Sequence, residues 1–209
     1  MRKQHISLKD TGRFSQLICD YLIEKKSLKK FYGYYPNLEN TRIQMELKKD
    51  HYSKQSRIVL VKALNSQYAK MTPEKAVIKN LKLLANENTF TVTTGHQLCL
   101  MTGPLYFIYK IISTINLVNS LKSQYPSYNF VPVFWLASED HDFDEISSIN
   151  LFNKKVSWKT NQIGSVGRMK LDDFDLVLDE LDDDLQDSGL AIKPNLKSKI
   201  SKDKLTLLR

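Results

Sequence analysis

The sequence has few cysteines, no signal-like N-terminus and no long apolar run, and each absence excludes a class of protein. Cys19 and Cys99 are the two cysteines in 209 residues, too few for the disulfide framework of a small secreted domain. The first residues lack the apolar stretch of a secretory signal. The most apolar run is interrupted by Lys110 and Asn116, so we expect no membrane span and a cytoplasmic protein.

The chain also lacks an even distribution of charge. Its formal net charge is +8. Residues 1–88 hold 18 Lys and Arg against 8 Asp and Glu, whereas residues 89–209 hold 13 against 15. A basic half is typical of nucleic-acid binding, but no recognised binding module accompanies it. Solvated surface lysines are therefore the simpler interpretation, and a basic nucleic-acid-binding module is kept as an alternative.

The first 88 residues are predicted to form a mainly helical region that packs on the core. Apolar spacing typical of one helix face predicts three helices, at residues 15–30, 41–50 and 53–69. A fourth helix is expected to begin with Thr72 as N-cap and Pro73 at the first helical position. It should end near residue 85.

A strand, a helix and a second strand follow. "TFTVTT" at residues 89–94 is rich in β-forming residues, and residues 105–122 carry an apolar helical stripe. "NFVPVFWLA" at residues 129–137 is a continuous apolar run, as in a strand covered on both faces. Helix and strand lengths match, which predicts a right-handed βαβ unit with two parallel strands. Trp135 and Trp158 are expected in the core.

The remaining elements complete an α/β fold. Residues 146–152 and 155–160 alternate like a β-hairpin, and residues 172–187 form an acidic helical pattern. The predicted organisation is a helical region at residues 1–88, a parallel-sheet core at residues 89–187 and an irregular tail at residues 188–209.

The first strand ends in Gly95-His96-Gln97, and Thr102-Gly103-Pro104 opens the next helix. We expect Gly95 to turn the chain sharply off the strand. Free N–H groups around Thr102 and Gly103 lie near the positive end of a helix dipole, where a phosphate or carboxylate binds well. Gly95, Thr102, Gly103 and Tyr106 are therefore assigned to an anion or nucleotide site. The alternative is that these glycines only make a tight connection.

The second strand leads directly into an acidic cluster. It contains five carboxylates and one imidazole within seven residues: Glu139, Asp140, His141, Asp142, Asp144 and Glu145. Like charges this close raise one another's pKa and cost stability, which is common at functional sites. Ligands of open α/β sheets bind at the carboxyl ends of the strands. The two clusters should therefore share one site.

Residue chemistry divides this site into roles. His96, Asp140 and His141 are predicted to be catalytic, by moving protons or holding charge. Gln97, Ser138, Glu139 and Asp142 are predicted to bind substrate, by gripping an ammonium group or Mg²⁺. Two alternatives stay open: a solvated loop of helix-capping acids, and a zinc site made by His96, His141 and an acid. No metal site is assigned.

Two long blocks carry a family resemblance. "TTGHQLCLMTGPLYFIYKIISTINLV" followed by "VPVFWLASEDHDFDEI" resembles the bacillithiol biosynthesis cysteine-adding enzymes, the cysteine ligase BshC family. The likeness extends over residues 14–187. It implies a Rossmann-like core with helical connecting elements, a C-terminal coiled coil and a homodimer in the full-length family. It also implies addition of cysteine to glucosaminyl-malate, the last step of bacillithiol biosynthesis, so these two small molecules are the expected substrates.

The family's members are longer than this chain, so the resemblance implies an N-terminal portion with a partial core, as if truncated. A truncated, non-catalytic fragment of the enzyme is the alternative to an active ligase. Joining a cysteine carboxyl to a sugar amine requires an activated carboxylate. ATP with Mg²⁺ is the cofactor that this chemistry suggests.

Overall fold

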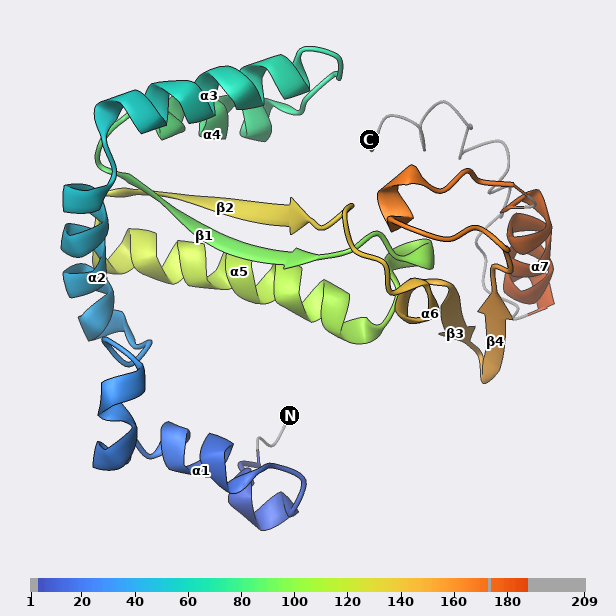
Figure 1. Ribbon diagram of the computed structural model, residues 1–209, viewed down its shortest axis with the longest axis horizontal. Coiled ribbons are helices and arrows are strands. Elements are labelled where there is room, and N and C mark those ends of the chain that lie inside the picture. The colour runs from blue at the N-terminus through green and yellow to red at the C-terminus, as the bar shows by residue number, and fades with distance from the viewer. Residues whose placement is uncertain (1–3, 173, 188–209) are drawn as a thin grey trace. The chain divides into compact units, whose positions relative to one another are not determined.

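The computed structural model describes residues 4–172 and 174–187 (Figure 1). The chain divides into two compact units, Met1–Ser53 and Lys54–Arg209, and the helices of residues 1–88 contribute to both. The predicted tail at residues 188–209 lies outside the described residues. Within the described ranges, every helix is too short or too polar to cross a lipid bilayer.

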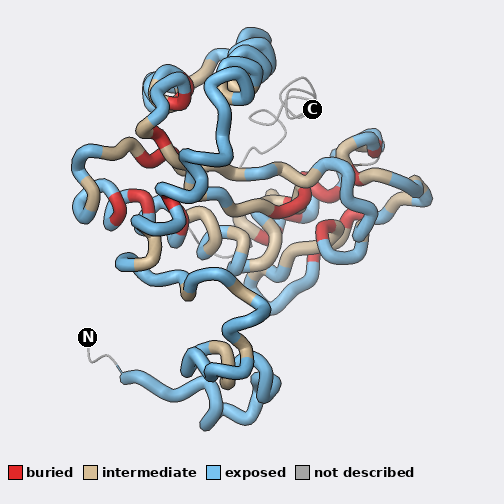
Figure 2. Tube along the Cα trace, turned by 60° about the vertical axis from the view of Figure 1, so that its left-hand side comes forward, coloured by how far each residue is buried: buried red, intermediate tan, exposed pale blue. Residues whose placement is uncertain are grey.

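The first unit is helical and has little core of its own. It contains η1 (Lys9–Thr11), α1 (Gln16–Leu22), η2 (Lys26–Phe31) and α2 (Leu38–His51). Ser15 caps α1 and Asn37 caps α2, each by accepting a backbone N–H with its side chain. The predicted single helix at residues 15–30 is wrong in its second half, because α1 ends at Leu22 and Glu24 has a positive φ of 52°. Met45 is the one buried residue among the described residues of this unit. In Figure 2 the described chain near the N-terminus is drawn mainly in the colours of exposed and intermediate residues.

The second unit begins with a pair of helices, α3 (Lys54–Tyr68) and α4 (Lys75–Leu84). The predicted start of α4 is two residues too early, because Glu74, with an extended backbone, is its N-cap. Val61 and Leu64 of α3 pack with Leu81 and Leu84 of α4 around Val131 of the sheet. The two helices thereby cover one face of the sheet.

A parallel βαβ unit forms the centre, as the sequence predicts. β1 (Thr89–His96) and β2 (Asn129–Leu136) pair in parallel, with Thr89 opposite Asn129 and His96 opposite Leu136. α5 (Leu105–Gln124) connects them and packs on both strands. In Figure 1 the sheet lies between α5 on one face and α3 and α4 on the other. The core is therefore covered on both faces, which agrees with the apolar sequence of β2.

Successive residues of β2 alternate between these two faces. Phe134 contacts Phe107 of α5, with ring centroids 5.2 Å apart, whereas Val131 and Val133 join the cluster with α3 and α4. Trp135 therefore points to the α3–α4 face, but the side chains packed there lie nearer the start of the strand. The prediction of a core position for Trp135 is wrong, since this residue is 61% exposed.

A second core cluster surrounds a β-hairpin. It gathers side chains from η3 (Leu100–Thr102), α6 (Phe143–Ile146), β4 (Lys154–Ser157), η4 (Val166–Arg168) and α7 (Phe174–Asp187). β3 (Ser148–Leu151) and β4 pair in antiparallel fashion, which confirms the predicted hairpin. Trp158 is buried in this cluster, as expected, and its indole N–H donates to the Asp172 carbonyl at 3.0 Å. Leu100 anchors the loop after β1 to the same cluster.

Candidate active site

The ends of the two parallel strands lie side by side. The Ala137 N–H, just beyond β2, donates to the His96 carbonyl at 3.0 Å. The residues that follow β1 and the acidic loop at residues 138–145 therefore leave the sheet at the same edge. This is the meeting of the two clusters that the predicted βαβ unit requires.

One carboxylate connects three side chains at this edge. The Gln97 side-chain amide donates to Glu145 Oε2 at 2.6 Å. The Tyr106 hydroxyl donates to Glu145 Oε1, and His96 Nε2 lies 2.7 Å from the Tyr106 oxygen and 3.3 Å from Glu145 Oε1. We call His96, Gln97, Tyr106 and Glu145 the Glu145 network. Its members come from β1, the residue after β1, α5 and α6.

The network has a buried and an exposed side. His96 is 8% exposed and Gln97 is 2% exposed. The Tyr106 residue and the Glu145 side chain are each 40% exposed. A small molecule at the end of the sheet can thus reach the Glu145 carboxylate and the Tyr106 hydroxyl, while His96 and Gln97 hold them from behind.

The hydrogen bonds restrict where the protons lie. Tyr106 has one hydroxyl proton, and it is used in the hydrogen bond that Tyr106 donates to Glu145. The Tyr106 oxygen can therefore only accept from His96, so His96 Nε2 carries a proton and donates it. His96 Nδ1 lies 3.2 Å from Cys99 Sγ and 3.1 Å from the Gln97 carbonyl. A neutral ring accepts a hydrogen bond from the Cys99 thiol at Nδ1, and a doubly protonated ring donates a hydrogen bond from Nδ1 to the Gln97 carbonyl. In both forms Nε2 keeps its proton on the side of Glu145.

The same contacts set the charges. Hydrogen bonds from Tyr106 and Gln97 hold the pKa of Glu145 below its ordinary value, although partial burial opposes them. The Tyr106–Glu145 hydrogen bond raises the pKa of Tyr106 to about 12. Burial, with a smaller contribution from the Glu145 charge, raises the pKa of Cys99 to about 11. At neutral pH the site therefore holds a carboxylate, a phenol and a thiol, and Cys99 is a poor nucleophile.

Gly95 has a different structural role from the predicted one. It lies inside β1 opposite Trp135, and its φ is not positive, so the prediction of a sharp turn is wrong. A Cβ at this position would lie 2.7 Å from the Trp135 carbonyl oxygen. Glycine is required here because the two strands approach closely. The Gly95 carbonyl accepts a hydrogen bond from Lys110 Nζ at 3.2 Å.

The second glycine also has a packing reason. Gly103 has a φ of 57°, and a Cβ there would lie 2.7 Å from Cys99 Cβ. Its N–H donates to the Leu100 carbonyl at 2.7 Å, so the expectation of a free amide at Gly103 is wrong. Met101 and Thr102 also adopt positive φ, of 44° and 72°. These values fit the alternative of a tight connection, and an anion site at Thr102 stays a prediction.

The acidic loop is exposed and bonded mainly to itself. Asp140 Oδ1 accepts the N–H groups of His141 and Asp142 at 2.7 and 3.2 Å. Asp142 Oδ1 accepts the Glu145 N–H at 3.1 Å and so caps α6. These bonds match the alternative of helix-capping acids. They leave the second oxygen of each carboxylate open to solvent or to a ligand.

The start of this loop is held by η4. The Ser138 carbonyl accepts two hydrogen bonds, one from the Ser165 hydroxyl at 2.8 Å and one from the Gly167 N–H at 2.9 Å. A Cβ on Gly167 would lie 2.6 Å from that carbonyl, so glycine permits this close approach. Ser138 and its neighbour Glu139 are themselves exposed, at the mouth of the predicted site.

Residues 4–172 and 174–187 contain no group of three His, Cys, Asp or Glu side chains placed to hold a metal ion. The zinc alternative therefore gains no geometric support from this part of the chain. Mg²⁺ commonly binds one or two carboxylates together with phosphate oxygens. The exposed carboxylates of Asp140 and Asp142 fit that smaller donor set.

Glu145 is the residue that sequence reasoning did not single out. It stood in the acidic cluster without a role of its own. One signal was available, because Asp142 followed three residues later by Glu145 is typical of a helix start. That signal predicts a capping role, however, whereas the Glu145 side chain reaches Gln97, which lies 48 residues earlier in the sequence.

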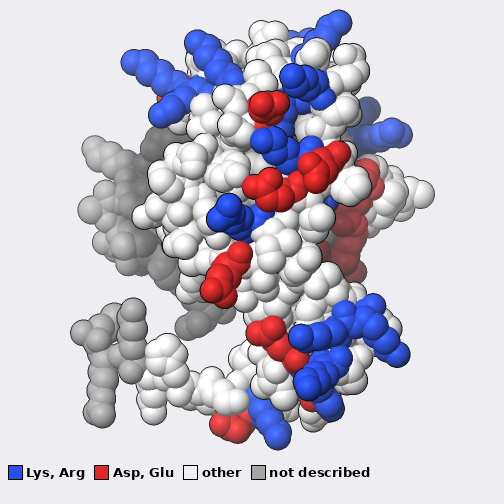
Figure 3. Space-filling model, turned by 90° about the vertical axis from the view of Figure 1, so that its left-hand side faces the viewer, with Lys and Arg blue, Asp and Glu red and all other residues white. Residues whose placement is uncertain are grey.

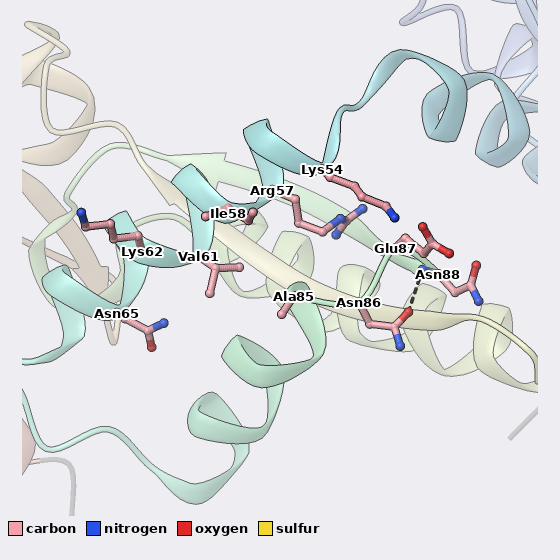
Figure 4. Close-up of a pocket in the computed structure, with 10 residues that line it drawn as sticks. All are labelled: Lys54, Arg57, Ile58, Val61, Lys62, Asn65, Ala85, Asn86, Glu87 and Asn88. Carbon is pink, nitrogen blue, oxygen red and sulfur yellow. Dashed lines mark hydrogen bonds between the residues drawn. The ribbon is translucent and has the colours of Figure 1, made fainter.

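A separate pocket lies at the opposite end of the sheet (Figure 4). It has a volume of about 640 Å³ and is formed by α3 and by the residues that connect α4 to β1. Arg57 donates to the Leu84 carbonyl at 2.8 Å and the Thr89 carbonyl at 3.3 Å, which ties α3 to the start of β1. The Asn86 side chain accepts the Asn88 N–H in the same loop. This pocket is distinct from the predicted site.

Lysine and arginine side chains do not occur apart from acidic ones on the surface that Figure 3 draws. Figure 3 shows Asp and Glu side chains among the Lys and Arg side chains of the face it presents. Within the first unit, Lys25 Nζ pairs with Asp20 at 2.7 Å. This mixture favours solvated surface charge over a nucleic-acid interface.

Known proteins resemble this chain over most of its length. Residues 1–204 match the family described as "Bacillithiol biosynthesis BshC, N-terminal Rossmann-like domain". A protein of Flavobacterium psychrophilum named "Putative cysteine ligase BshC" is 52% identical over 165 residues, covering 78% of this chain and 31% of the relative. Proteins of the same name from Flavobacterium johnsoniae and Bacillus thuringiensis are 51% and 35% identical over 174 and 162 residues. These matches cover 83% and 77% of this chain, and 33% and 28% of those relatives.

Proposed function

Because the chain belongs to the BshC family of bacillithiol biosynthesis, we propose that it forms the Rossmann-like part of a cysteine ligase. The proposed reaction is the last step of the pathway, in which the cysteine carboxyl and the amine of glucosaminyl-malate form an amide. The chain spans about a third of the length of the relatives it matches. The proposed activity therefore belongs to the longer protein, with this chain contributing the strand-end site.

The Glu145 network is the observation that carries this proposal. Glu145 is ionised and half exposed, and Gln97 and Tyr106 fix both of its oxygens. A carboxylate with a lowered pKa is a poor base but a good anchor for an ammonium group. We assign Glu145, with Tyr106, to holding the ammonium group of cysteine. His96 and Gln97 are positioning residues that act through it.

Proton transfer is assigned to the exposed loop. When the sugar amine attacks the activated carboxyl carbon, its nitrogen must lose a proton as the amide forms. His141 is exposed beside Asp140 on the loop next to Glu145. A neutral imidazole has a ring nitrogen that can accept this proton. His141 is thus the proposed proton acceptor.

We propose ATP with Mg²⁺ as the activating cofactor, which would convert the cysteine carboxylate into a better acyl donor. Asp140 and Asp142 would contact Mg²⁺ through their open oxygens, and Thr102 lies at the predicted anion site. Glu139 and Ser138 would line the entrance for the sugar. The proposed location is the cytoplasm, where Cys19 and Cys99 stay free thiols, as they are in the structure.

A chimera tests the proposal. The matched part of the Flavobacterium johnsoniae relative is replaced by this chain's residues, and product is measured by mass spectrometry. Loss of a charged hydrogen bond to cysteine should raise the KM for cysteine about 10- to 100-fold in Glu145→Gln. Loss of the proton acceptor should lower kcat about 100-fold or more in His141→Ala. Unchanged constants in both variants would remove this edge of the sheet from the mechanism.

The 209-residue chain should be assayed alone in the same way. If it folds, yet gives no product where the chimera is active, the chain by itself is a non-catalytic fragment of the ligase. A folded chimera without activity would contradict the proposed reaction.

A further inference from the structure

Helix α5 has two apolar faces, and the sheet covers only one of them. Thr114, Val118 and Leu121 point to the sheet and are buried. Residues on a helix are about 100° apart, which places Leu105, Tyr109 and Ile112 on the opposite side and Ile108 and Ile115 at its edge. We call these five residues the α5 patch. All are exposed: Leu105 by 62%, Ile108 by 37%, Tyr109 by 61%, Ile112 by 48% and Ile115 by 43%.

The α5 patch ends half-way along the helix. The same outward side continues with Asn116, Asn119 and Ser123, which are exposed and polar. A helix face that meets water is normally polar along its whole length. Contiguous apolar patches on a protein surface usually mark an interaction site. The first turns of α5 therefore have the composition of a covered surface, and the last turns have that of a solvated one.

The sheet beside α5 is incomplete as well. Among the described residues, β1 and β2 pair only with each other, so each has an unpaired outer edge. Parallel sheets are normally buried and contain more strands, and an open edge favours pairing with further chain. The exposed Trp135 lies at the carboxyl end of β2. Both features indicate that more polypeptide packs around this core.

The relatives supply a candidate for that polypeptide. The family model describes an N-terminal domain, and the chain covers 31% and 33% of two relatives. We infer that the α5 patch is the docking surface for the polypeptide that follows the matched residues in these longer relatives. The inference does not depend on the proposed reaction. It explains why the patch is apolar only over half of the helix.

Two substitutions made in two contexts test this surface. Ile112→Glu places a charge in the patch, and Asn119→Glu places the same charge on the polar half of the same side. In the 209-residue chain, both should change the Tm equally and little, because both positions are exposed. In the chimera, Ile112→Glu should lower the Tm by several degrees more than Asn119→Glu, since its charge is buried without a partner. An equal effect of the two substitutions in the chimera would overturn the inference.

Hydroxyl-radical labelling of Tyr109 provides a second measurement, which needs no variant. Tyr109 should be labelled several-fold more slowly in the chimera than in the 209-residue chain. Equal rates would overturn the inference. A second result would also overturn the inference: protection of Tyr109 in the 209-residue chain that rises with protein concentration and is absent from the chimera. A second copy of the chain would then be the occupant of the patch. Neither measurement uses turnover, so its outcome is separate from that of the proposed reaction.

Discussion

The ends of the two parallel strands carry similar densities of polar residues but are built in opposite ways. At the end of β1, His96 and Gln97 are buried and bonded to side chains from other elements. After β2, Asp140 and Asp142 are exposed and bonded to the backbone of their own loop. The less conspicuous cluster is thus the more strongly constrained one. Glu145, the last acid of the exposed loop, joins the two.

The largest expected difference between the two ends is in stability. Gln97→Ala removes a fully buried side chain and leaves a cavity, so it should lower the free energy of unfolding by about 2–4 kcal/mol. Denaturant titration of the 209-residue chain measures this. A loss below about 1 kcal/mol would show that the buried end is not constrained as described.

The next effect concerns the titration of Tyr106. Its raised pKa of about 12 comes first from the hydrogen bond to Glu145. In Glu145→Gln the pKa should fall toward the ordinary value of about 10. The stabilisation linked to this bond is present below pH about 10 and is lost as the pH rises through about 12. NMR with labelled tyrosine follows the change, and an unaltered titration would refute the assigned cause.

A smaller effect is expected at the exposed end. Asp142→Ala removes the cap of the short helix α6 and should cost about 1 kcal/mol. Asp144→Ala, in the same loop and also exposed, should change stability by less than about 0.5 kcal/mol. Thermal unfolding of both variants provides the comparison. If Asp142→Ala lowers the free energy of unfolding as much as Gln97→Ala does, the contrast between the two strand ends disappears.

The smallest effect is the pH dependence that comes from Glu145. Its pKa is lowered, so its contribution is present above the ordinary value of 4.5 and is lost as the pH falls through the lower folded value. The stability difference between the protein and Glu145→Gln should narrow between pH 6 and pH 3. With the side chain 40% exposed, the change should stay below about 1 kcal/mol. A difference that widens on acidification would contradict the charge assignment.

The sequence predicted the features that depend on local pattern and length. The βαβ unit, its parallel pairing and the hairpin follow from strand composition and from the span of α5. Trp135 could not be placed, because exposure depends on how far α3 and α4 reach over the sheet. The close approach at Gly95 depends on the neighbouring strand.

The candidate site shows the same limit of prediction from sequence. The sequence indicated both strand ends, and His96 and Gln97 proved to lie with Tyr106 at one edge. It could not show that Glu145 bonds to Gln97 across 48 positions, because that contact exists only after the sheet and α6 have packed. Nor could it show that Asp140 and Asp142 cap their own loop. Composition locates such a cluster, and packing decides which of its members are connected.

The most direct test compares two neighbouring acids in the chimera. Glu145 is bonded to Gln97 and Tyr106, whereas Asp144 is exposed. Steady-state kinetics should show a KM for cysteine raised about tenfold or more in Glu145→Gln and unchanged in Asp144→Asn. Equal KM values in the two variants would contradict the claim that the Glu145 network is the working part of this edge.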